Sequence, residues 1–118
     1  MSESLKLTVE RLDGLAILSA EGYLNSPGGV EIVRTASGLM EQGYRVLLLN
    51  LSGTKIVNLQ GLSFLSELFD KVKGIQGRLA FCSLTPTLGK IFRILRLGQE
   101  TGIFADQESA VSRLLQRG

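Results

Sequence analysis

The sequence predicts an α/β protein built on a mixed, mostly parallel sheet of four to five strands, and three observations predict this fold class. The pair Asp13-Gly14 separates two apolar segments, which is typical of a β-hairpin. The run Val46-Leu47-Leu48-Leu49 is continuously apolar, as expected for a strand that is covered on both faces. After the hairpin, helical and strand patterns alternate to the end of the chain, which favours parallel strands joined by right-handed crossovers.

The first third of the chain predicts a hairpin followed by a helix. Residues 5–10 alternate in part between apolar and polar side chains, and residues 15–20 are mostly apolar, so both segments are predicted to be strands. Residues 22–29 predict a loop. At its end, Ser26-Pro27 offers a helix N-cap followed by proline at the first helical position. The helix that begins there is predicted to end at Gly43.

The middle of the chain predicts a buried strand that leads to an exposed helix N-terminus. The apolar run 46–49 ends in Asn50-Leu51-Ser52, a turn is expected next, and the apolar pair Ile56-Val57 precedes a helix-start signal at Asn58. The helix that follows is predicted to end near Gly74. Many α/β proteins place their working residues at such a helix start, so the residues that follow Asn58 are the candidate site.

The last third of the chain predicts two more strands and two more helices. Residues 78–83 have the composition of a strand, and Thr85-Pro86 repeats the cap-and-proline helix start. This third helix is predicted to end near Gly98. A short strand is expected at residues 103–104, and Asp106 is expected to cap the last helix.

Composition excludes several classes of function. The chain has 118 residues and a net charge of +2 that is spread along its length, so it predicts one domain and no binding of nucleic acid. No histidine is present and Cys82 is the one cysteine, so we expect no Ser-His or Cys-His catalytic pair, no metal site, no cofactor and no disulfide. No signal peptide and no membrane-length apolar run is evident, which predicts a cytoplasmic protein without direct membrane insertion.

Particular residues in this order resemble the STAS domain of the anti-sigma factor antagonist (anti-anti-sigma factor) family. The matching segments are Gly22-Tyr23-Leu24-Asn25, Asn50-Leu51-Ser52, Ile56-Val57-Asn58-Leu59-Gln60-Gly61-Leu62, Gly77-Arg78-Leu79 and Thr85-Pro86. The resemblance covers essentially the whole chain. It implies a single STAS domain over residues 1–118, with an N-terminal hairpin and about four helices packed mainly on one face of the sheet.

The resemblance also implies a function and a site. In this family, the second serine of an Asp-Ser-Ser-Gly-Leu motif is phosphorylated by an anti-sigma factor that is also a serine kinase. The unphosphorylated protein binds that kinase and so frees the sigma factor. Here Asn58, Leu59 and Gln60 stand where the family has the aspartate and the two serines. The resemblance therefore implies a non-enzymatic regulator of transcription that binds its partner and is not phosphorylated at the usual position. The expected partner-binding residues are Tyr23, Asn25, Ser26, Asn58, Leu59, Gln60, Gly61 and Ser63.

Several polar and small residues of the sequence also have a purely structural interpretation. Asn58 would serve as a helix cap alone, and Gly61 would serve only close packing. Ser63 is either a polar surface residue or a substitute phosphorylation site. Lys90, Arg93 and Arg96 recur every three residues, which indicates either a solvated helix face or a surface for an acidic partner.

Two other classes of function stay open. A motif without a phosphorylatable serine also fits a scaffold subunit of a stressosome-like assembly, or the cytoplasmic STAS subunit of a lipid-transport ATPase. A small-ligand or nucleotide-binding role is the third alternative, because open α/β sheets bind ligands beyond the carboxyl ends of their strands. The sequence leaves the oligomeric state open between a monomer, a homodimer and a larger assembly.

Overall fold

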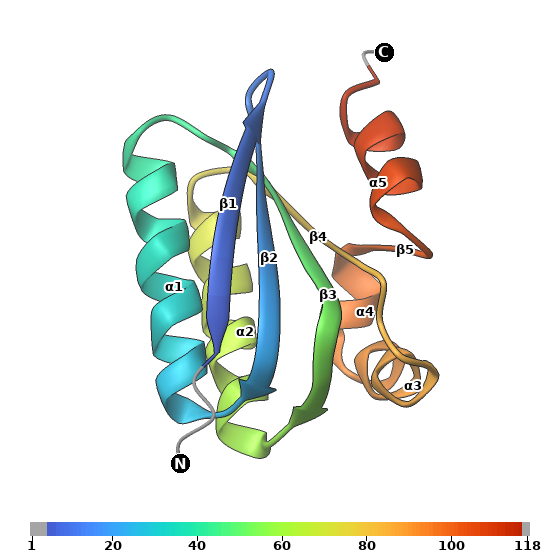
Figure 1. The fold of residues 1–118 in the computed structure, drawn as a ribbon. Helices are drawn as coiled ribbons and strands as arrows, with labels where there is room; N and C mark the ends of the chain where they lie inside the picture. Colours follow the sequence, from blue (N-terminus) through green and yellow to red (C-terminus); the bar gives the residue numbers. More distant parts are fainter. Residues whose placement is uncertain (1–4, 117–118) are drawn as a thin grey trace.

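A computed structural model describes residues 5–116, which form five strands and five helices (Figure 1). The strands are β1 (Lys6–Leu12), β2 (Leu15–Leu24), β3 (Val46–Val57), β4 (Arg78–Cys82) and β5 (Gly102–Phe104). The helices are α1 (Ser26–Glu41), α2 (Leu59–Gly74), α3 (Pro86–Ile94), α4 (Arg96–Glu100) and α5 (Gln107–Leu114). The sheet has the order β1-β2-β3-β4-β5, with β1 and β2 antiparallel and every later neighbour parallel. This arrangement confirms the predicted fold class.

The helices cover the two faces of the sheet unequally. Leu47 and Leu49 of β3 pack on one face in a large apolar cluster that includes residues of α1 and α2 and Phe92 of α3. Leu48 packs on the opposite face in a smaller cluster with Leu114 of α5. Figure 1 shows α1 and α2 side by side on one side of the sheet and α5 on the other. The helices are therefore mainly on one face, as predicted.

Two segments predicted to be irregular continue as strands. β2 extends to Leu24 through the predicted loop, and β3 extends to Val57 through the predicted turn. Pairing with a neighbouring strand overrides the weak local signal, and β3 accommodates it by two register shifts against β2, each adding one residue to β3. The hydroxyl of Thr54, which is fully buried in this stretch, donates to the Ala20 carbonyl oxygen at 3.0 Å. The predictions of a loop and of a turn were wrong for these stretches, because no local sequence pattern reveals which strands pair.

Side-chain caps begin four of the helices, and three of these caps agree with the prediction. Asn58 caps α2, Thr85 caps α3, and Asp106 caps α5. The cap of α1 is Asn25, whose Oδ1 accepts from the Gly28 amide at 3.0 Å, so Ser26 is the first helical residue and not the cap. Adjacent Asn and Ser are comparably good caps, which explains the error of one residue.

The third helix is interrupted where the sequence predicts it to continue. α3 ends at Ile94, Leu95 adopts an extended conformation, and the short α4 carries the chain on to Glu100. Gly98, predicted to end the helix, lies within α4. A Cβ atom there would lie 2.6 Å from the Arg93 Cα atom, so close packing of the two short helices explains the glycine better than helix termination.

Two titratable groups near α5 depart from their ordinary behaviour. Hydrogen bonds from the amide and hydroxyl of Ser109 lower the pKa of Asp106, which favours the ionised cap at the helix N-terminus. Burial raises the pKa of the Cys82 thiol, whose side chain is fully covered. Cys82 therefore stays protonated at neutral pH and packs as a small core residue.

Candidate functional site

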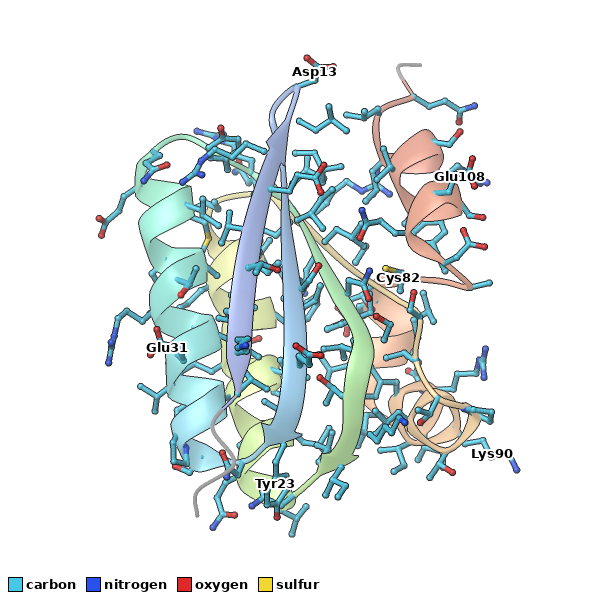
Figure 2. The ribbon with its side chains drawn as sticks, in the orientation of Figure 1. Asp13, Tyr23, Glu31, Cys82, Lys90 and Glu108 are labelled. Carbon is cyan, nitrogen blue, oxygen red and sulfur yellow. The ribbon has the colours of Figure 1, made fainter. Side chains whose placement is uncertain are left out.

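The candidate site lies at the carboxyl edge of the sheet, where β2 leads into α1 and β3 leads into α2. Asn25 and Asn58 occupy equivalent positions in these two crossings, and each side-chain oxygen accepts an amide hydrogen bond from the third residue along the chain. The distances are 3.0 Å from Gly28 and 2.9 Å from Gly61. Figure 2 places Tyr23 at this end of the molecule.

The starts of α1 and α2 are joined to each other through the backbone of Leu24. The Asn58 amide donates to the Leu24 carbonyl oxygen at 3.1 Å. Gly61 packs on the same peptide group, so that a Cβ atom at Gly61 would lie 2.9 Å from the Leu24 carbonyl carbon. Only a glycine lets α2 approach so closely. This contact gives the first turn of α2 a set position relative to the strand ends.

The first turn of α2 presents its side chains to solvent. Leu59 is 80% exposed, although burial of an apolar side chain of this size is worth about 1.5–3 kcal/mol. Gln60 and Ser63 are also exposed, whereas Gly61 between them is buried. The exposed part of the predicted site on α2 therefore consists of one apolar and two neutral polar side chains. None of the three carries a charge.

A second exposed apolar side chain lies beside this turn, and sequence reasoning missed it as a site residue. Ile56 is 60% exposed and pairs with Tyr23 in the parallel register of β2 and β3. Their successors Leu24 and Val57 pack in the larger cluster, so alternation places Tyr23 and Ile56 on the opposite face of the sheet. The two register shifts together add two residues to β3, so they leave the alternation unchanged and Ile56 lies on the same face as Val46 and Leu48. Alternation assigns the face of a side chain but does not reveal whether a helix covers the sheet at that point.

The predicted contact residues thus fall into two groups. Leu59, Gln60 and Ser63 are exposed and their side chains are open to a partner. Asn25, Asn58 and Gly61 hold the backbone that presents them, and the two asparagine oxygens are occupied as helix caps. Tyr23 and Ser26 are half-buried between the two groups. The structure therefore brings all eight predicted residues to one edge, where some side chains are exposed and others are buried or occupied as helix caps.

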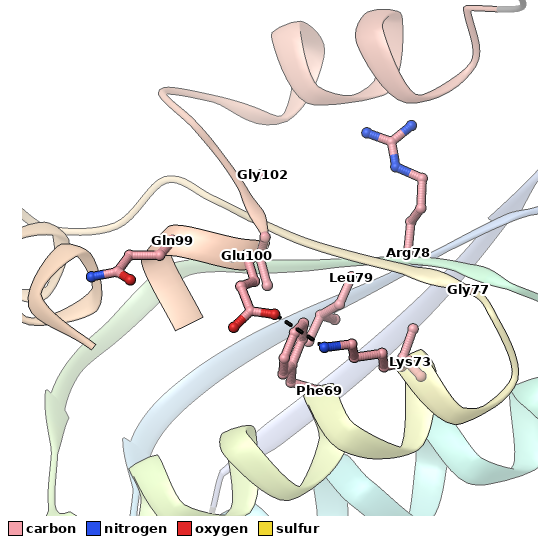
Figure 3. A pocket seen from close by; sticks show the side chains of 10 residues that line it. Phe69, Lys73, Gly77, Arg78, Leu79, Gln99, Glu100 and Gly102 are labelled. Carbon is pink, nitrogen blue, oxygen red and sulfur yellow. Dashed lines mark hydrogen bonds and ion pairs between the residues drawn. The ribbon is translucent and has the colours of Figure 1, made fainter. Parts of the chain in front are cut away.

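The structure also contains a cavity away from this site. It has a volume of about 420 Å³ and lies at the opposite edge, between the end of α2 and the starts of β4 and β5 (Figure 3). Lys73 and Glu100 form a 3.2 Å ion pair across it, and Lys73 also lies over the Phe69 ring. Within residues 5–116, no three His, Cys, Asp or Glu side chains are grouped as metal ligands. None of the helices formed by those residues is both long and apolar enough to cross a membrane.

Comparison of the sequence with models of known protein families identifies the family of this chain. The family model described as the STAS domain matches residues 6–110. The chain belongs to the STAS domain family. This STAS protein is 26% identical over 90 residues to BtrV of Bordetella bronchiseptica, whose name places it among the anti-sigma factor antagonists. The match covers 76% of this chain and 78% of BtrV.

Solved structures share the fold of this STAS protein at low sequence identity. A crystal structure of an anti-sigma factor antagonist from Mycobacterium paratuberculosis has a TM-score of 0.82 at 15% identity and covers 95% of both chains. The unphosphorylated form of SpoIIAA, a Bacillus anti-sigma factor antagonist, has a TM-score of 0.77 at 20% identity, over 92% of this chain and 96% of SpoIIAA. A phosphorylated form of SpoIIAA shares the same fold, with a TM-score of 0.74.

Proposed function

We propose that this STAS protein is an anti-sigma factor antagonist-like regulator, which binds a serine-kinase-type anti-sigma factor and so influences sigma-factor-dependent transcription. Family membership supports this proposal, as do the names of BtrV and SpoIIAA. The observation that carries it is the exposed Leu59 on a rigid helix start. An exposed leucine on a backbone held by two asparagine caps and a glycine contact is pre-organised as an interface anchor.

The proposed contact surface comprises Tyr23, Ile56, Leu59, Gln60 and Ser63, supported from below by Asn25, Ser26, Asn58 and Gly61. Such a patch supplies apolar anchors at its centre and neutral polar groups around them, the composition found in the cores of protein interfaces. Affinity then depends on how well a partner pocket fits Leu59 and Ile56. The net charge of the chain contributes little to it.

We propose further that this binding is not switched by phosphorylation at position 60. Gln60 has no hydroxyl group to accept a phosphate, whereas its amide still donates and accepts hydrogen bonds. Ser63, one helical turn further along α2, is the substitute acceptor to be tested, because its side chain is exposed on the same helix. SpoIIAA, by comparison, has been solved in both phosphorylated and unphosphorylated forms.

Calorimetric titration of purified serine-kinase-type anti-sigma factors from the source organism tests the proposal. We expect the wild-type protein to bind one of them, and Gln60→Asp to bind it about tenfold more weakly or worse, because an unpaired carboxylate in a closed interface is costly. Gln76→Asp is the matched control, since Gln76 is exposed in the turn between α2 and β4. Failure of the wild-type protein to bind any such kinase would overturn the proposal.

A permanent assembly role is the alternative outcome of the same work. If no kinase binds and light scattering finds a large homo-assembly, the scaffold interpretation replaces the regulatory one. A complex with a permease and an ATPase encoded nearby would favour a transporter subunit instead.

A further inference from the structure

Helix α3 carries an unusual exposed face. Lys90 and Arg93 are exposed, and the apolar Ile94 beside them is 77% exposed. Spacings of three and four residues place Lys90 next to both of the others on the helix surface. The side chain of Arg96, which the sequence pattern groups with these cations, lies outside the described part of the structure.

The positive charge of this face has no acidic counterpart on its own helix. Among the described helices of eight or more residues, α3 is the one with basic but no acidic residues. Neither Lys90 nor Arg93 forms an ion pair with any residue of the described range 5–116. Arg34, in contrast, pairs with Glu31 within α1 at 3.4 Å. The cations of α3 are therefore available to an external acidic group.

The position of α3 places this face close to the surface proposed to bind the anti-sigma factor. β4 is the parallel neighbour of β3, and α3 follows the carboxyl end of β4 just as α2 follows the carboxyl end of β3. Figure 2 shows Lys90 and Tyr23 at the same end of the molecule. Neighbouring strands lie about 4.8 Å apart. A standard interface of about 800 Å² on each partner is roughly 30 Å across, which is wide enough to extend from the start of α2 to the helix that follows the neighbouring strand.

We propose that the face formed by Lys90, Arg93 and Ile94 is a second contact with the same partner, and that it receives an acidic surface of that partner around a small apolar pocket. The inference rests on the proposed function. Its physical basis is charge complementarity, because two uncompensated cations at the rim of an interface accelerate encounter with an acidic surface. Ile94 supplies an apolar contact beside those cations and slows dissociation.

The test measures association of the kinase that binds the wild-type protein, by stopped flow and calorimetry at 50 and 300 mM NaCl. We expect Lys90→Glu/Arg93→Glu to weaken binding about tenfold at low salt, mainly through a slower association rate, and to reduce the salt dependence. The matched control, Arg45→Glu/Lys71→Glu, makes the same charge change in two exposed residues near the opposite edge of the sheet. We expect it to change binding by less than about twofold.

The outcomes separate the two proposals. If the wild-type protein binds and both double variants weaken binding equally, the α3 contact is overturned and the proposed function stands. If the wild-type protein binds no kinase, both proposals fall.

An anionic lipid membrane is the alternative to an acidic protein surface as the ligand of these cations. Vesicles containing 30% phosphatidylserine test this alternative. Loss of vesicle binding in the α3 variant, with unchanged kinase binding, would also overturn the proposal. Ile94→Ser is expected to raise the dissociation rate in the kinase complex.

Discussion

Gly61→Ala is expected to lower the free energy of unfolding by about 2–3 kcal/mol, the range of an overpacked site that cannot relax easily. The added methyl group would lie 2.9 Å from the Leu24 carbonyl carbon, and its nearest neighbour, the carbonyl oxygen, belongs to the same peptide group. Backbone atoms of β2 cannot rotate away as the end of a side chain can. The start of α2 must therefore move away from the strand. Urea unfolding followed by circular dichroism measures the loss.

Gly74→Ala is the matched control for this substitution. Gly74 is the last residue of the same helix, and apart from its chain neighbours and the backbone of that helix, no described atom lies within 4 Å of the position that its Cβ would occupy. Alanine there is expected to be neutral or to stabilise the protein by a few tenths of a kcal/mol, because alanine is the better helix former. Equal losses from the two substitutions would mean that the Leu24 contact is not what determines the effect at Gly61.

Leu59→Ser is expected to weaken binding of the anti-sigma factor at least tenfold while leaving the free energy of unfolding within about 0.5 kcal/mol of wild type. The side chain is 80% exposed in the free protein, so the folded chain loses little packing when it is replaced. In a complex, the same side chain would fill a partner pocket. The combination of a large binding effect with a small stability effect distinguishes an interface anchor from a core residue.

Leu12→Ser serves as the control for this second prediction. Leu12 ends β1, at the hairpin turn on the opposite edge of the sheet, and is 37% exposed. We expect that variant to bind the partner as the wild type does, whatever its effect on stability. Calorimetry and urea unfolding on both variants provide the comparison. Unaltered binding by Leu59→Ser would remove Leu59 from the interface.

The sequence was most informative where a local pattern has one physical meaning. The apolar run 46–49 predicted a strand covered on both faces, and its residues divide between the two apolar clusters. Asn58, Thr85 and Asp106 were predicted as helix caps, and each forms the capping hydrogen bond. These signals act over three or four residues, so a single sequence is sufficient to interpret them.

The errors arose where a distant segment decides the local structure. The continuation of β3 through Thr54 depends on pairing with β2, more than thirty residues earlier, and on register shifts that no local pattern reveals. Ile56 lies on the face of the smaller apolar cluster but outside that cluster, and this local lack of cover is not visible in the sequence, so the candidate surface is larger than the sequence indicated. The choice of Asn25 over Ser26 as the cap of α1 is a smaller error of a different kind, because these two adjacent residues are equally suited to the position.

The central claim is that a partner-docking surface is retained at the start of α2 while phosphorylation no longer controls it. The most direct measurement incubates the protein with its bound anti-sigma kinase and ATP, then records binding and phosphate content by mass spectrometry. We predict that wild-type protein stays unphosphorylated and bound, whereas Gln60→Ser gains one phosphate at residue 60 and dissociates as the added negative charge disrupts docking. ATP-dependent release of the wild-type protein, with phosphate on Ser63, would contradict the claim.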